Sequence, residues 1–145
     1  YVVMTASPGM AVRELFPLDV VLMSVPPGIL TSLLLLINEF PDLEADKKGG
    51  RYHLVILLGR KKAAVVYTIG MIATFGVIIG AALFQVVSPW FMLALLPLPF
   101  AFKAVMGALK HNDNHSKLVP ALGMNVITVH ATDLLIAVAV LIEAF

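Results

Sequence analysis

Long uncharged stretches separated by short charged segments dominate the chain. Residues 20–37 carry no charge, and neither do the 40 residues between Lys62 and Lys103. As one helix, the longer stretch would reach about 60 Å at ~1.5 Å per residue, roughly twice the hydrocarbon thickness of a bilayer. It must therefore fold back on itself, and we expect the turn at residues 85–89, where Ser88 and Pro89 interrupt the apolar pattern.

The hydropathy pattern as a whole predicts an all-α, multi-pass transmembrane bundle that forms a single domain. The expected spans are four, at about residues 18–40, 63–84, 89–109 and 121–144. Pro26-Pro27 in the first span, and Pro97 and Pro99 in the third, are expected to bend or break their helices. Membrane helices accept such interruptions where neighbouring groups satisfy the freed carbonyls.

Composition supports this assignment. The chain is 60% hydrophobic and 13% charged, whereas soluble domains average about 45–50% and about 25%. These values argue against a soluble enzyme, a disordered tail or a nucleic-acid binder, and a formal net charge of +1 gives a polyanion little to bind. Cysteine is absent, which excludes disulfides, thiolate metal sites and cysteine nucleophiles. The lipid bilayer is the expected surroundings.

The distribution of lysine and arginine predicts the orientation. Nine of the ten basic residues lie in, or within reach of, the loops that follow the first and third spans. The positive-inside rule places both loops in the cytoplasm. The tenth, Arg13, belongs with Ser7-Pro8-Gly9 to a predicted outer turn. Because the chain starts without methionine or a signal peptide, we expect it to be the later part of a longer protein of the cell membrane.

Polar residues are concentrated where the first span ends. Asn38, Asp42 and Asp46 are spaced by four, so a continuing helix would place them on one face, with Glu39 beside it. Carboxylates this close repel one another, and acidic groups near a helix C-terminus oppose its dipole. A bound cation would relieve both costs. Oxygen ligands without cysteine suit Mg²⁺, which usually combines one or two carboxylates with phosphate oxygens.

Basic residues follow directly. Lys48, Arg51 and the run at residues 60–62 are able to neutralise phosphate oxygens, and Gly49-Gly50 is expected to end the helix. The alternative interpretation is a solvated helix end followed by an ordinary cytoplasmic loop, and for the basic run by itself that alternative is favoured. The acidic face and the basic loop together favour a binding site.

This segment resembles the second aspartate-rich motif of the UbiA superfamily of intramembrane prenyltransferases. The similar positions are Asn38, Asp42, Asp46, Gly50-Arg51, His53-Leu54 and Leu58-Gly59-Arg60. The form of the motif is closest to the branch that acts on 1,4-dihydroxy-2-naphthoate in menaquinone biosynthesis. Outside residues 38–60 the resemblance is limited to hydropathy and span order. Val55 and Leu57 depart from residues common in the family, which weakens a third phosphate contact there.

The resemblance implies the C-terminal part of a nine-helix fold and a magnesium-dependent reaction. A polyprenyl group would pass from polyprenyl diphosphate to an aromatic acceptor. Asp42 and Asp46 would be the catalytic metal ligands, Asn38 would support them, and Lys48 or Arg51 would bind the diphosphate. The family's first aspartate-rich motif is absent from these residues, so the missing N-terminal half is expected to supply it.

A second ionisable group lies in the last span. His130 and Asp133 are one helical turn apart near the expected middle of the membrane, where such residues are costly and often functional. They are equally consistent with a proton relay or acceptor-orienting pair, and with a packing pair or an ion pair to Lys103. The alternative function is therefore a transporter or channel module in which these three residues line an ion path.

Overall fold

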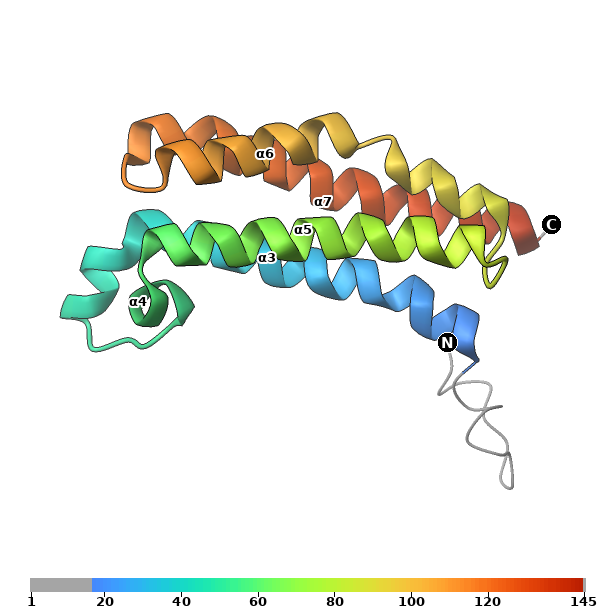
Figure 1. Cartoon of the computed structure of the whole chain (residues 1–145), viewed down its shortest axis with the longest axis horizontal. Helices are drawn as coiled ribbons and strands as arrows, with labels where there is room; N and C mark the ends of the chain where they lie inside the picture. Colours follow the sequence, from blue (N-terminus) through green and yellow to red (C-terminus); the bar gives the residue numbers. More distant parts are fainter. Residues whose placement is uncertain (1–16, 145) are drawn as a thin grey trace, which may run out of the picture.

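The computed structural model describes residues 17–144, and every regular element in that range is helical. The helices are α3 (Leu18–Lys48), α4 (Leu54–Leu58), α5 (Arg60–Leu83), a 3₁₀ helix η1 (Pro89–Leu95), α6 (Leu98–His111) and α7 (His115–Ala144). Figure 1 shows the long helices side by side, with α4 beside the end of α3. The all-α fold class predicted from the sequence is confirmed.

Four helical units form the bundle. Helix α3 packs on α5 and α7, and α6 packs on α5 and α7, so the core lies between all four. Helices α3, α5 and α7 are each long and apolar enough to cross a membrane. Helices η1 and α6 are bent by 40° at their junction and count as a fourth span if taken together. The bend falls at Leu96-Pro97, where a break was expected.

Helix α3 keeps its prolines inside it. It runs without interruption from Leu18 to Lys48 and includes Pro26, Pro27 and Pro41, so of the bend or break expected at Pro26-Pro27 no break is found. A proline removes one backbone donor per site, and flanking hydrogen bonds and packing are enough to keep the helix continuous. The helix also extends beyond residue 40, so Asp42 and Asp46 lie on it as well.

The segments that contain most of the charged residues lie at one end of the bundle. The end of α3, helix α4, the start of α5 and the turn between α6 and α7 all lie there (Figure 1). Both basic loops are therefore at the same end, as an even number of crossings between them requires. That this end faces the cytoplasm stays a prediction. The expected outer turn at Ser7-Pro8-Gly9 and Arg13 lies outside the described residues.

The core combines apolar packing with one buried polar link. Leu30, Leu33, Ile37 and Phe40 form a buried stripe along α3, with the helical spacing expected of a face turned toward its neighbours. Between α5 and α7, the Tyr67 hydroxyl donates a hydrogen bond of 2.6 Å to Oδ1 of Asn125. In an apolar medium, such a bond satisfies two groups that would otherwise be costly to bury.

Helices α6 and α7 pack closely together at a glycine. A Cβ atom added at Gly107 would lie 2.4 Å from Cβ of Ala121 and 3.5 Å from its Cα, so relief would require the helices to separate. Small residues allow membrane helices this proximity. We predict that Gly107→Ala destabilises the folded protein by about 1–3 kcal/mol, the usual cost of overpacking. Thermal unfolding in detergent would measure the loss.

Gly123 on α7 provides the matched control. A Cβ atom there would meet nothing within 4 Å, and alanine favours a helix by about 1 kcal/mol over glycine. Gly123→Ala should therefore leave the melting temperature unchanged or raise it slightly. Equal melting temperatures for the two variants would contradict the close contact between α6 and α7.

Candidate functional site at the end of helix α3

The end of α3 is shaped by two glycines. The Gly50 N–H donates to the Lys47 carbonyl at 3.3 Å, and the Arg51 N–H donates to the Asp46 carbonyl at 3.0 Å. This pair of bonds is the Schellman motif, which needs a left-handed residue before the chain turns back. Gly50 supplies it with φ 71°, a conformation that costs other residues energy. The motif returns Arg51 to the level of Asp46.

The Arg51 side chain then pairs with the same residue. Its Nη1 atom lies 3.2 Å from Oδ1 of Asp46. The arginine side chain is 76% exposed, whereas that of Asp46 is 14% exposed. The carboxylate is therefore held in the protein, and the guanidinium is free to reach other anions from the solvent side.

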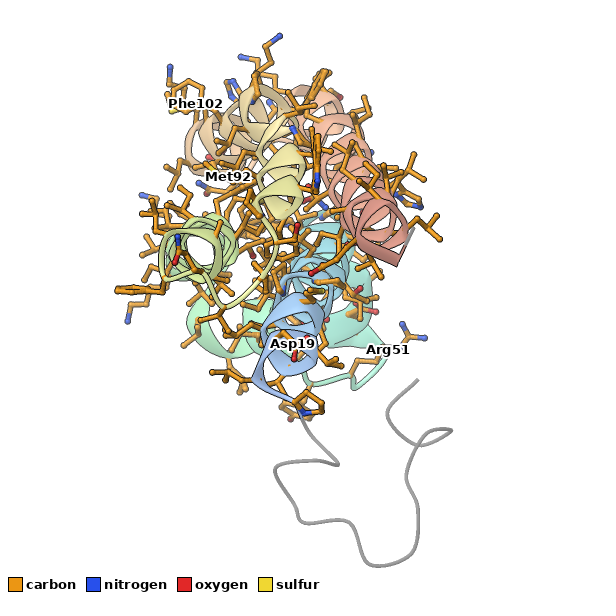
Figure 2. The ribbon with its side chains drawn as sticks, turned by 90° about the vertical axis from the view of Figure 1, so that its right-hand side faces the viewer. Asp19, Arg51, Met92 and Phe102 are labelled. Carbon is orange, nitrogen blue, oxygen red and sulfur yellow. The ribbon has the colours of Figure 1, made fainter. Side chains whose placement is uncertain are left out.

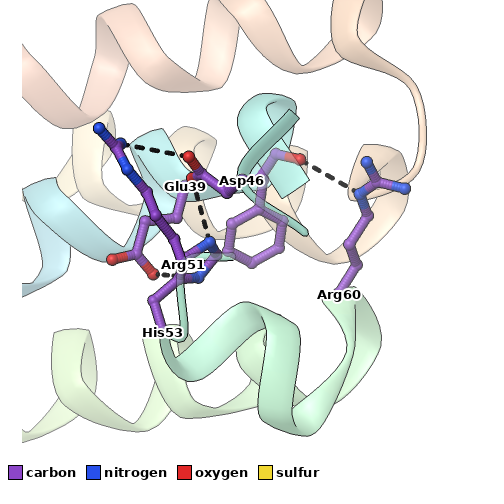
Figure 3. Close-up of polar contacts among 6 residues, drawn as sticks. Glu39, Asp46, Arg51, His53 and Arg60 are labelled. Atoms are coloured by element: carbon purple, nitrogen blue, oxygen red, sulfur yellow. Dashed lines mark hydrogen bonds and ion pairs between the residues drawn. The ribbon is translucent and has the colours of Figure 1, made fainter. Parts of the chain in front are cut away.

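His53 lies between two carboxylates. Its Nδ1 atom is 2.9 Å from Oε2 of Glu39, and its Nε2 atom is 3.2 Å from Oδ2 of Asp46 (Figure 3). Both ring nitrogens are shielded from solvent, and neither contact has hydrogen-bond geometry.

These groups line an open pocket of about 480 Å³. Its wall consists of Leu35, Asn38, Glu39, Asp42, Asp46, Arg51, Tyr52 and His53. Leu35, Asn38 and Asp42 are exposed on the side of α3 away from its buried stripe. Figure 2 shows Arg51 on the opposite side of the bundle from Phe102 of α6. The predicted polar face therefore exists, and it opens away from the pair α5–α6.

A hydrogen bond between residues far apart in the sequence fixes the start of α5 against α3. The Nε atom of Arg60, the first residue of α5, donates to the Phe40 carbonyl at 3.2 Å (Figure 3). Phe40 is itself almost fully buried. The start of α5 is thus tied to α3 between Glu39 and Pro41, which limits how far the segment that carries Arg51 and His53 can move.

The side-chain oxygens of this site can hold a hard metal ion only together with oxygens from a bound phosphate group. Within residues 17–144, no group of three or more histidine or acidic side chains is arranged to hold a metal. Asp42 and Asp46 nevertheless offer two carboxylates on one face, and Asn38 offers an amide oxygen. Mg²⁺ is commonly held by one or two carboxylates together with substrate phosphates. The residues fit that mode of binding.

The other candidate residues lie elsewhere. Lys48 is exposed at the end of α3 and does not line the pocket. His130 on α7 is exposed, and its Nδ1 atom lies 2.9 Å from the Val126 carbonyl of its own helix. Oδ1 of Asp133 is buried without a hydrogen-bond partner. In the described part of the chain, no ion pair joins Asp133 to His130 or Lys103, so a connected ion path is not seen.

Sequence reasoning gave no role to His53 or Tyr52, although both line the pocket. The available signal was position: both follow directly after Arg51 and precede the start of α4. A turn that returns Arg51 to α3 also returns the next two residues to the same end of the helix, although their side-chain contacts depend on the path of the chain after the turn.

Comparison with known proteins places these features in a family. The 1,4-dihydroxy-2-naphthoate octaprenyltransferase of Bacillus subtilis (strain 168) is 30% identical to this chain over 125 residues, which are 86% of this chain and 40% of that protein. No solved structure matches the chain significantly. The sequence profile described as the UbiA prenyltransferase family matches residues 2–127. The chain therefore belongs to the UbiA prenyltransferase family.

Proposed function

We propose that the protein transfers a polyprenyl group from a polyprenyl diphosphate to an aromatic acceptor, a quinone precursor such as 1,4-dihydroxy-2-naphthoate, in a Mg²⁺-dependent reaction. The observation that carries the proposal is the pocket at the end of α3. It brings Asn38, Asp42 and Asp46 together with Arg51 at the end of an apolar bundle. The family, and the activity for which the Bacillus relative is named, support the reaction class.

The residues divide into two groups by charge. Asp42 and Asp46 would hold Mg²⁺, with the Asn38 amide oxygen beside them on the same face. Arg51, exposed at the pocket, would contact diphosphate oxygens, because a guanidinium can bind two phosphate oxygens at once. Lys48 adds positive charge at the same helix end. A diphosphate bound here would lie between metal and cations.

The proposed chemistry is departure of the diphosphate from an allylic carbon, followed by attack of the aromatic ring on the resulting cation. The attacked ring carbon then loses a proton, or CO₂ where it carries a carboxylate, which restores the aromatic ring. Mg²⁺ supplies neutralisation of the negative charge that grows on the leaving diphosphate. Arg51 adds a fixed positive group on the same anion, and such preorganised charge is often the largest contribution to catalysis. Leu35 gives the pocket an apolar edge for the isoprenoid chain.

The site as described supplies only part of the ligands. Because the chain spans 40% of the length of its Bacillus relative, we propose that a second aspartate-rich segment outside these residues completes the metal site. The proposed location is the cytoplasmic mouth of a cell-membrane protein, where the water-soluble diphosphate is accessible while the prenyl chain stays in lipid.

The first test concerns Asp42. Asp42→Asn removes one negative charge but keeps the size of the side chain, so Mg²⁺ would lose a ligand. We expect prenyl transfer by the full-length protein in membrane vesicles to fall by about 10²–10³-fold, the range seen when one preorganised electrostatic group is removed. Chelation of Mg²⁺ with EDTA should abolish activity in the unmodified protein, and added Mg²⁺ should restore it.

Glu44→Gln is the control for Asp42→Asn. Glu44 is an exposed acidic residue of the same helix that does not line the pocket, and the substitution removes the same charge. Its turnover should match that of the unmodified protein. Unchanged turnover in Asp42→Asn, or equal losses in both variants, would contradict the assigned role of Asp42.

The second test concerns Arg51. Arg51→Ala should raise the KM for polyprenyl diphosphate at least tenfold, because an ionic contact to the diphosphate is lost. Initial rates at varied diphosphate concentration would measure it. Lys117→Ala removes an exposed positive charge at the start of α7 and should leave the KM unchanged. A KM that is insensitive to Arg51→Ala would show that Arg51 does not bind the diphosphate.

A further inference from the structure

We propose that His53 is a positioning residue that orients Asp46 for the metal ion, and that Glu39 acts by anchoring the other side of the histidine ring. The inference rests on the proposed function, because it concerns the same metal site. It assigns a role to two residues whose part in the site neither the motif nor the comparisons define.

The two oxygens of Asp46 have different partners. Oδ1 faces Arg51, whose side chain is 76% exposed, and Oδ2 faces His53, whose side chain is 13% exposed. Ion pairs with an exposed partner are weak and exchange readily with other ions. The contact with His53 is shielded from solvent on both ring nitrogens. Oδ1 is therefore the oxygen that becomes free, and Oδ2 is the one that stays held.

This asymmetry explains how the carboxylate can serve a metal. When a diphosphate enters, Arg51 can move from Oδ1 of Asp46 to a phosphate oxygen, because both are anions of similar geometry. Oδ1 then faces the pocket and is open to Mg²⁺. His53 keeps Oδ2 in place, which fixes the direction in which Oδ1 points. Groups that orient a metal ligand in this way commonly change metal affinity by about 10–100-fold.

Glu39 has the complementary position. Its Oε2 atom lies 2.9 Å from Nδ1 of His53, the nitrogen that does not face Asp46. The ring of His53 is thus held from both sides, by the carboxylate of Glu39 on one side and that of Asp46 on the other. Glu39 would otherwise be a candidate metal ligand, because it also lines the pocket. The contact indicates instead that its effect on the metal passes through His53.

Asp42 provides the contrast within the same pocket. Among the residues that the structure describes, Asp42 forms no ion pair, and its side chain is exposed. It can approach a metal without exchanging a partner. The pocket therefore contains one carboxylate that is free and one that is oriented by His53.

The experiment measures metal binding directly. Mn²⁺, used as a probe for Mg²⁺, would be titrated into the purified full-length protein in the presence of a fixed concentration of inorganic diphosphate, and protein-bound Mn²⁺ would be followed by electron paramagnetic resonance. We expect His53→Ala to weaken Mn²⁺ binding about tenfold. His53→Gln should restore most of the affinity, because the glutamine amide places an N–H donor near the position of Nε2. The Mg²⁺ concentration for half-maximal activity should shift in parallel, with a smaller change in kcat.

A double-mutant cycle tests the role of Glu39. Glu39→Ala alone should weaken Mn²⁺ binding about as much as His53→Ala, and Glu39→Ala should add nothing in a His53→Ala background. Two multiplicative losses would overturn the proposal, because they would make Glu39 a separate metal ligand. Unchanged Mn²⁺ affinity in His53→Ala would overturn it as well. Should His53→Ala not fold, equal loss of affinity in His53→Gln and Glu39→Ala would count against it.

The outcome is separable from that of the proposed function. Metal binding that depends on Asp42 and His53 in a protein without prenyl transfer would leave the positioning role intact and refute the reaction. Conversely, prenyl transfer that depends on Asp42 but is accompanied by His53-independent Mn²⁺ binding would support the reaction and refute the positioning role.

Discussion

The site depends on the length of α3 relative to the membrane. A helix of 31 residues is about 46 Å long at ~1.5 Å per residue, whereas the hydrocarbon core is about 30 Å thick. The last turns of α3 can therefore extend beyond the lipid interior while remaining part of one rigid helix. This allows Asp42 and Asp46 to be charged, yet keeps them fixed to the same element whose other face carries Phe40 in the core.

Extension of the helix creates an electrostatic problem that the next residues reduce. Acidic groups near a helix C-terminus are unfavourable, and Glu39 and Asp46 are brought close to each other by the fold. Arg51 and His53 compensate because the glycine-dependent turn returns them to α3. Asp42 remains uncompensated among the described residues, which is the arrangement expected of a group whose partner is a bound ion. The pocket thus contains one carboxylate, that of Asp46, that contacts Arg51 and His53, and another, that of Asp42, that has no such partner among the described residues.

Much of this architecture is predictable from local patterns. Uncharged stretches locate the spans, a spacing of four places Asn38, Asp42 and Asp46 on one face, and Gly49-Gly50 indicates where α3 ends. Those signals depend only on helix geometry and glycine conformation. The contacts of His53 were not predictable, because they depend on how the chain turns after the helix and on which side chains become buried. Whether Pro26-Pro27 would bend or break α3 was also not decided by the sequence, because packing can offset a lost backbone bond and keep the helix continuous.

The pocket is local in sequence, and the bundle holds it in place. Every side chain that lines the pocket comes from residues 35–53, so one continuous segment builds it. The bundle holds that segment at two points, through the burial of Phe40 and through the bond from Arg60 to the Phe40 carbonyl. Substitutions in the core, such as those between α6 and α7, should therefore act mainly on stability. Substitutions near Phe40 and Arg60 should alter stability and site geometry together, because both points hold the helix face that carries the carboxylates.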